Sequence, residues 1–232
     1  MIKKVIIITG AKGTLGQAAV SKFLSENYHV IATVSSGNSL GFMDEHPEVE
    51  VFPVNLSDEN QTKIFIDDVT NRHKIIDSVL LLVGGFASGT IIETAVSEIE
   101  KMISLNFYTA YNVLRPLLPQ MKQQKDGGKI IFIGARPALL PNEGKNFLAY
   151  ALSKSLLFKL ADFINAEVAT SKVFATVIVP GTIDTPLNRS TQPDADFSKW
   201  ISPERMAEQI YETISNDKQS FTGSVLKVYE DE

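Results

Sequence analysis

Residues Val5–Gly16 read Val-Ile-Ile-Ile-Thr-Gly-Ala-Lys-Gly-Thr-Leu-Gly and give the strongest indication of the fold. Its first four residues are apolar and β-branched, as in a strand buried on both faces of a parallel sheet. Glycines follow, and apolar residues then recur at helical spacing from Ala18 to Leu24. This order predicts a phosphate-binding turn, because glycine lets the backbone approach an anion and the first N–H groups of the helix bind it. The alternative is an ordinary strand-to-helix turn that happens to be rich in glycine.

The rest of the chain repeats this alternation of strands and helices. Further strands are predicted at 28–34, 49–54, 78–83, 129–133, 173–179 and 221–228, and helices at 58–73, 97–125, 150–169 and 203–215. Pro116 and Pro119 are expected to bend the 97–125 helix or to separate its last turns. Without repeats or a break in composition, the pattern predicts one α/β domain over residues 1–232. We expect a doubly wound Rossmann-type domain with a mostly parallel sheet of about seven strands.

Composition excludes several kinds of site. The chain has no cysteine, so disulfides, thiolate metal ligands and cysteine nucleophiles are excluded. Its three histidines (His29, His46 and His73) share no metal-ligand spacing, and no metal site is predicted. The net charge of −5 argues weakly against a nucleic acid or an anionic membrane as partner. No run of apolar residues is long enough for a membrane span or a signal peptide, so a cytoplasmic location is predicted.

Tyr150 and Lys154 are the first candidate catalytic pair. Four residues apart on a helix, they lie on one face. A phenol ionises near pH 10, and an ammonium beside it is expected to lower that pKa and make the hydroxyl a usable acid or base. An isolated pair of this kind is more often a surface tyrosine and a solvated lysine. Here Gly10, Gly84 and Pro180 also follow predicted strands. Because the carboxyl ends of parallel strands meet at one sheet edge, this clustering favours a catalytic role for the Tyr150–Lys154 pair.

The glycine turn and the Tyr150-x-x-x-Lys154 motif resemble those of the short-chain dehydrogenases/reductases, and the resemblance covers nearly the whole chain. It implies an NAD(P)H-dependent oxidoreductase with a small-molecule substrate, and Tyr150, Lys154 and Asn106 as catalytic residues. Asn106 matches the asparagine that holds a proton-relay water in that family. The implied cofactor-binding residues are Gly10, Lys12, Gly13, Thr14, Leu15, Gly16, Ser35, Asn55, Leu56, Gly84, Gly85, Lys154, Pro180, Gly181, Thr182 and Ile183.

NADP(H) is favoured over NAD(H). The end of the second predicted strand lacks the acidic residue that binds the ribose hydroxyls in NAD-dependent folds. Ser35 and Ser36 stand there instead, and Lys12 offers a positive charge.

One departure from the family narrows the function. The serine that usually follows the fifth strand and polarises a carbonyl is replaced by Ala135. Quinonoid dihydropteridine reductase is a branch that also lacks it, and Val83–Phe86, Pro180–Arg189 and Pro193–Trp200 resemble that branch. The long segment 182–200 is expected to form a substrate lid. The missing acid after the second strand, and a slightly longer loop before Tyr150, argue against the same branch.

The resulting hypothesis is hydride transfer to a conjugated imine or carbonyl, with Tyr150 as proton donor. Two alternatives stay open: another ketone or 3-oxoacyl reductase of the family, or a non-catalytic protein that senses NAD(P). Arg136 is expected to contact substrate or cofactor, or to pair with an acid of the lid. The 150–169 helix is apolar nearly all round, which with the family resemblance favours a homodimer or homotetramer through it and the 97–125 helix.

Overall fold

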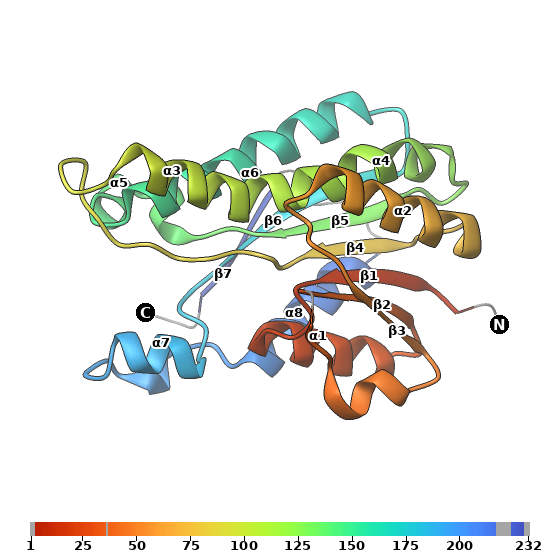
Figure 1. Ribbon diagram of the computed structural model, residues 1–232, viewed down its shortest axis with the longest axis horizontal. Coiled ribbons are helices and arrows are strands. Elements are labelled where there is room, and N and C mark those ends of the chain that lie inside the picture. The colour runs from red at the N-terminus through yellow and green to blue at the C-terminus, as the bar shows by residue number, and fades with distance from the viewer. Residues whose placement is uncertain (1–2, 36, 217–223, 230–232) are drawn as a thin grey trace.

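A single parallel sheet forms the centre of the protein (Figure 1). The computed structural model describes residues 3–35, 37–216 and 224–229. Ser36, the predicted strand start at 221–223 and the acidic tail at 230–232 lie outside the described residues. The sheet has seven strands in the order β3-β2-β1-β4-β5-β6-β7, all paired in parallel. They are β1 (Val5–Thr9), β2 (His29–Val34), β3 (Val49–Pro53), β4 (Ser78–Leu81), β5 (Gly128–Ile133), β6 (Val173–Pro180) and β7 (Val225–Val228).

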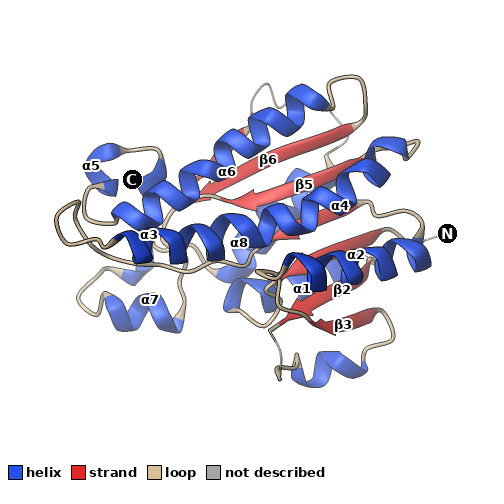
Figure 2. Ribbon diagram, turned by 45° about the horizontal axis from the view of Figure 1, so that its top comes forward, coloured by secondary structure: helices blue, strands red, loops and turns tan. Residues whose placement is uncertain are grey.

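Helices cover both faces of the sheet, which confirms the predicted doubly wound domain. One face carries α2 (Glu59–His73), α3 (Val96–Ile103), α4 (Thr109–Gln123) and α6 (Leu148–Glu167), and the other carries α1 (Thr14–Ser25) and α8 (Pro203–Ser215) (Figure 2). Along β1, Ile7 joins the core of the first face while Ile6 and Ile8 join the core of the second. All three are fully buried, as a β-branched run in a central parallel strand requires.

The strand order reverses between β1 and β4. In an open parallel sheet this reversal leaves a crevice beyond the carboxyl ends of the two strands, where ligands bind. The segments after β1, β4, β5 and β6 therefore meet at one edge. Short helical pieces lie in the connections: η1 (Gly41–Glu45), η3 (Arg136–Ala138), α5 (Pro141–Gly144), α7 (Pro186–Thr191) and η4 (Phe197–Lys199).

The predicted 97–125 helix is interrupted at a different place from the one expected. Pro116 and Pro119 both lie inside α4, which continues to Gln123, so they do not separate its last turns. The departure from α-helical geometry is instead a π-helical turn, η2 (Ser104–Tyr108), between α3 and α4. Such turns often occur at functional sites, and this one holds the buried Asn106.

Several apolar side chains of these helices stay exposed. On α6, Leu157, Ala161 and Ile164 are buried in the core, but Leu152 and Phe163 are 44% and 69% exposed. Among the described residues, no helix is both long enough and apolar enough to cross a membrane.

Candidate active site

The glycine turn after β1 is shaped by close backbone contacts. Gly10 has a φ of +65°, and a Cβ there would lie 3.2 Å from the Val83 nitrogen. A Cβ on Gly16 would lie 2.4 Å from the Gly10 oxygen, so only glycine lets α1 pack directly onto the turn. Gly13 precedes the first residue of α1, and no described side chain caps that end. The first N–H groups of α1, at the positive end of its dipole, are suited to an anion.

A cavity of about 600 Å³ opens beside this turn, within the range of small-molecule sites. It is lined by the end of β2, by the segments that follow β1 to β4, and by one residue each of η2 and α4. The lining residues are Gly10, Lys12, Gly13, Thr33, Val34, Ser35, Val54, Asn55, Leu56, Ser57, Leu82, Val83, Gly84, Leu105 and Thr109. Seven of the predicted cofactor-binding residues are therefore brought together: Gly10, Lys12, Gly13, Ser35, Asn55, Leu56 and Gly84. Thr14, Leu15 and Gly16 form the first turn of α1 next to it.

Two consecutive hydrogen bonds connect side chains on the part of the cavity wall that follows β2. The Lys12 ammonium donates to Asn38 Oδ1 at 2.5 Å, and the Asn38 amide donates to Ser35 Oγ at 2.5 Å. Lys12 and Ser35 are thus held on the same part of the cavity wall. This is the place after β2 where NAD-dependent folds have an acidic residue and this chain has none.

Asn106, Lys154 and the Gly84-Gly85 backbone meet at the end of β4. Gly85 N–H donates to Asn106 Oδ1 at 2.8 Å, and Asn106 Nδ2 donates to Gly85 O at 3.1 Å and to Ser153 Oγ at 2.8 Å. Lys154 Nζ donates to Ile133 O at 2.8 Å, which holds it at the end of β5. A Cβ on Gly84 would lie 2.6 Å from Asn106 Oδ1 and 3.3 Å from Lys154 Nζ, so these groups need a glycine there.

Burial controls the pKa values of the Tyr150–Lys154 pair. It raises the pKa of the Tyr150 phenol to about 12 and lowers the pKa of the Lys154 ammonium to about 8. The predicted lowering of the phenol pKa by the ammonium is therefore not seen in the protein alone, because desolvation sets the direction of the shift. At neutral pH the phenol keeps its proton, which suits a proton donor rather than a base.

Comparison with known proteins identifies the family. Residues 4–196 match the family model described as short chain dehydrogenase. The chain belongs to the short-chain dehydrogenase/reductase family. It is therefore an NAD(P)-dependent oxidoreductase. The dihydropteridine reductase of Dictyostelium discoideum is 26% identical over 97% of this chain and 94% of that protein. The 3-oxoacyl-[acyl-carrier-protein] reductase FabG of Thermotoga maritima is 24% identical over 97% of this chain and 96% of that protein.

Solved structures of the family share the fold. A structure of ElxO with NADP bound superposes with a TM-score of 0.83 at 22% identity, covering 98% of this chain and 97% of that one. The structure of gox2181 superposes with a TM-score of 0.88 at 18% identity, covering 98% of this chain and 95% of that one.

In this short-chain dehydrogenase/reductase, Phe86 packs against Tyr150 and Phe147 packs against Phe86. The ring centroid of Phe86 lies 5.1 Å from that of Tyr150 and 5.2 Å from that of Phe147. Phe86 is 55% exposed, so a flat substrate can reach it. Ala135, which is predicted to stand where the family usually has a serine, is buried after β5. Phe86 and Phe147 were not predicted as site residues, although Phe86 directly follows the Gly84-Gly85 pair.

Arg136 directly follows Ala135 in the β5–α6 connection. Its guanidinium donates to Glu143 at 2.8 Å and lies over the Tyr229 ring, 4.9 Å from the centroid. The acid beside it is Glu143 of the same β5–α6 connection, rather than the acid of the lid that the sequence suggested.

The segment 182–200 has more internal structure than the sequence indicated. It contains α7 and η4, and its ends are joined by a bridge between Ile183 and Ile201. Asp184 accepts two hydrogen bonds from Arg189, both at 2.6 Å, and Arg189 lies over the Phe197 ring. Phe197 in turn packs on Trp200, with centroids 4.7 Å apart. Several residues that resemble the dihydropteridine reductase branch therefore hold this segment together. Their contacts explain why such residues occur there.

The predicted nicotinamide turn lies apart from the cavity. Pro180 ends β6, two strands along from β4, and Gly181–Ile183 follow it; none of these is among the described residues that line the cavity. Gly181 N–H donates to Val228 O at 2.9 Å, which ties this turn to β7. A Cβ on Gly181 would meet nothing within 4 Å, so this position is open.

Proposed function

We propose that this enzyme reduces a flat, conjugated, electron-poor acceptor of the quinonoid dihydropterin kind. Ala135 carries the proposal: a methyl group replaces the hydroxyl that would polarise an ordinary carbonyl. An acceptor that is already electron-poor needs less polarisation. The aromatic wall of Phe86 and Phe147 supports a planar substrate, because offset and edge-to-face ring contacts stabilise one.

The cavity beside the glycine turn, which we take as the cofactor groove, supports a preference for NADP(H) over NAD(H). The uncapped N–H groups at the start of α1 suit the pyrophosphate, and the cavity beside them suits the adenosine half. Lys12 and Ser35, joined through Asn38, would bind a 2′-phosphate. Gly84 and the Pro180–Ile183 turn would hold the nicotinamide, which would supply the hydride.

The proton is supplied by Tyr150 in this proposal. Its phenol is protonated at neutral pH and gives its proton to the substrate nitrogen or oxygen. Lys154, fixed by Ile133 O, binds the nicotinamide ribose hydroxyls and stabilises the phenolate that is left. Asn106 positions a water that connects Lys154 to solvent.

We further propose that residues 182–200 form the substrate lid, and that the exposed apolar side chains of α4 and α6 form a homodimer or homotetramer interface. Tyr111 on α4 and Leu152 and Phe163 on α6 would be buried there. The cytoplasmic location stays a prediction.

Two alternatives make different predictions. The 24% identity to the 3-oxoacyl reductase is close to the 26% identity to the dihydropteridine reductase, which supports a ketone or 3-oxoacyl substrate as the second candidate. A non-catalytic NAD(P) sensor would bind cofactor without turnover.

The test is NADPH and NADH oxidation with quinonoid dihydropterin, compared with a ketone panel that includes a 3-oxoacyl thioester. We expect kcat/KM for the pterin to exceed that for every ketone by about tenfold or more. Faster turnover of a ketone would replace the proposed substrate, and tight NADPH binding without any turnover would identify a sensor.

A further inference from the structure

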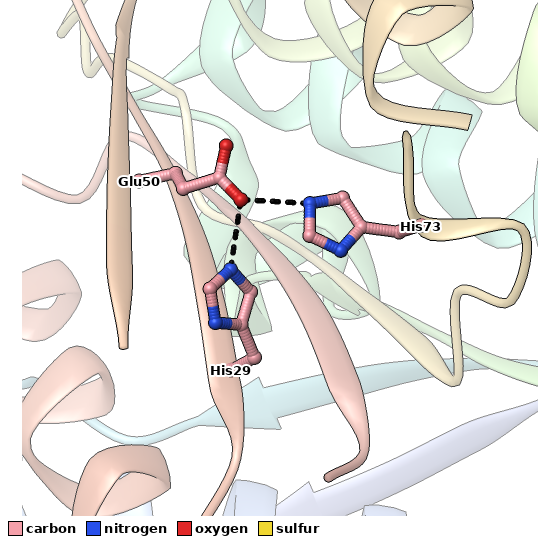
Figure 3. Close-up of side chains that lie close together, drawn as sticks. All are labelled: His29, Glu50 and His73. Carbon is pink, nitrogen blue, oxygen red and sulfur yellow. Dashed lines mark hydrogen bonds and ion pairs between the residues drawn. The ribbon is translucent and has the colours of Figure 1, made fainter. Parts of the chain in front are cut away.

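Two histidines and a glutamate meet at the sheet edge opposite the cofactor groove. His29 is the first residue of β2, Glu50 lies near the start of β3, and His73 is the last residue of α2. In Figure 3 both imidazoles approach one oxygen of the Glu50 carboxylate. His29 Nε2 lies 2.9 Å from Glu50 Oε1, and His73 Nε2 lies 2.7 Å from the same atom. One ligand atom from each residue lies within 4.8 Å of the others.

Strand register and helix packing bring these residues together. Ile31 pairs with Glu50, and side chains two apart on a strand share a face, so His29 is the diagonal neighbour of Glu50. Helix α2 packs on this face through Phe65 and Val69. His73 follows Val69 by one turn and therefore lies on the same side of the helix.

Two of the three ligands, His29 and Glu50, have a second partner that orients them. His29 Nδ1 lies 3.2 Å from Glu48 Oε2, and a proton shared there leaves the Nε2 lone pair directed at the cluster. The other oxygen of Glu50 accepts from Arg72, whose guanidinium is also held by Asp68 at 2.9 Å. A carboxylate behind a histidine is the usual outer support of a metal-bound imidazole.

We propose that His29, Glu50 and His73 form a binding site for a divalent transition-metal ion of the Zn²⁺ type. Two imidazole nitrogens and one carboxylate oxygen are a ligand set that Zn²⁺ accepts, with water as the fourth ligand. The ion replaces the two hydrogen bonds to Glu50 Oε1. At bond lengths of about 2.0–2.2 Å the ligand atoms need to move by about 1 Å, which these side chains can do. The side chains are 17%, 25% and 18% exposed, so an ion can enter from solvent.

The position of this site indicates a structural role. It lies at the amino ends of β2 and β3, a full strand length from the Lys12–Ser35 wall. A bound ion would tie the last turn of α2 to the edge of the sheet, so it would raise thermal stability without taking part in hydride transfer.

The experiment uses the full-length chain without a polyhistidine tag, and Co²⁺ and Zn²⁺ as probes. We expect one Co²⁺ per chain with the visible absorption of a tetrahedral site, displaced by Zn²⁺, and a rise in Tm with Zn²⁺ that EDTA reverses. His29→Asn and His73→Asn should each weaken binding by about 100-fold or more, and Glu48→Gln by about 10–100-fold. NADPH binding at the other edge reports that each variant is folded.

His46 provides a matched control. It is exposed, it accepts a hydrogen bond from the Glu48 backbone at 3.2 Å, and it lies outside the cluster. His46→Asn should leave ion binding unchanged. If wild-type protein binds neither ion at one per chain, or if folded His29→Asn and His73→Asn proteins bind as wild type does, the cluster is an ion-pair network only and the proposal is overturned.

Discussion

Asn106 and Gly85 exchange two hydrogen bonds, with Gly85 N–H donating to Oδ1 at 2.8 Å and Nδ2 donating to Gly85 O at 3.1 Å. This pairing ties the π-helical turn η2 to the segment that follows β4. Asn106 also donates to Ser153, which lies between Tyr150 and Lys154 on α6. Through Asn106, three elements are held in a fixed relation around the proposed reaction centre.

Asn106→Ala should therefore lower both stability and activity. Because the half-buried backbone groups of Gly85 lose their partner and the buried Ser153 hydroxyl keeps only its bond to Tyr150 O, we expect the free energy of unfolding to fall by about 2–4 kcal/mol. Urea denaturation measures this change, and kcat should also fall. Asn165 offers a control because it exchanges two hydrogen bonds with Ala175 outside the site. Asn165→Ala should lose stability and keep kcat; if both variants keep kcat, Asn106 has a structural role only.

Tyr150→Phe should lower kcat by about 10²-fold or more, because the general acid is removed while the ring is kept. Steady-state kinetics measures kcat, and a cofactor titration should show NADPH affinity within a few-fold of wild type. Tyr211→Phe on α8, which covers the opposite face of the sheet from α6, is the control and should change neither value. A folded Tyr150→Phe protein with wild-type kcat would show that another group gives the proton.

The pH dependence should follow Lys154 rather than Tyr150. Burial lowers the pKa of Lys154 to about 8, so its positive charge is lost as the pH rises through about 8. Tyr150, with a pKa of about 12, keeps its proton over this range. We expect kcat/KM, which reports the free enzyme, to decrease above about pH 8. Lys154→Met should have lower activity and should lose this alkaline limb; a limb that persists in the variant would assign it to another group.

Cofactor preference should depend on Lys12. Lys12→Ala should weaken NADPH binding by about tenfold and change NADH binding little, because only NADPH carries the 2′-phosphate. Ser35→Asp should weaken NADPH binding further, because it places a negative charge at the same wall. Fluorescence titration of the apo protein measures both cofactors, with Lys63→Ala on the exposed side of α2 as control. Tighter binding of NADH than of NADPH by wild type would reverse the proposed preference.

The exposed apolar residues of α6 should be buried in a dimer or tetramer. Phe163→Glu and Leu152→Glu are expected to give monomers, because an interface that must bury a charge is destabilised. Light scattering gives the mass. Leu187→Glu is the matched control, since Leu187 is 68% exposed on α7 and lies outside the proposed interface. A wild-type mass of one chain would rule the interface out.

The predictions of the fold that the structure confirms depend on local sequence. The strand at Val5–Ile8 and the glycine turn need only neighbouring residues, and the β-α alternation then restricts the sheet to a parallel arrangement. The π-helical turn at Ser104–Tyr108 was not predicted, because the prolines ten residues later gave the stronger local signal for an interruption.

The parallel α/β fold, the glycine turn and the spacing of Tyr150 and Lys154 could all be predicted from the sequence, since they are set by residues close together along the chain. The pKa values of that pair depend on the folded structure, because the burial that shifts both of them comes from distant elements. The same holds for the His29–Glu50–His73 cluster. Its members lie 21 and 23 residues apart and meet only because of the β2–β3 register and the packing of α2 on that face.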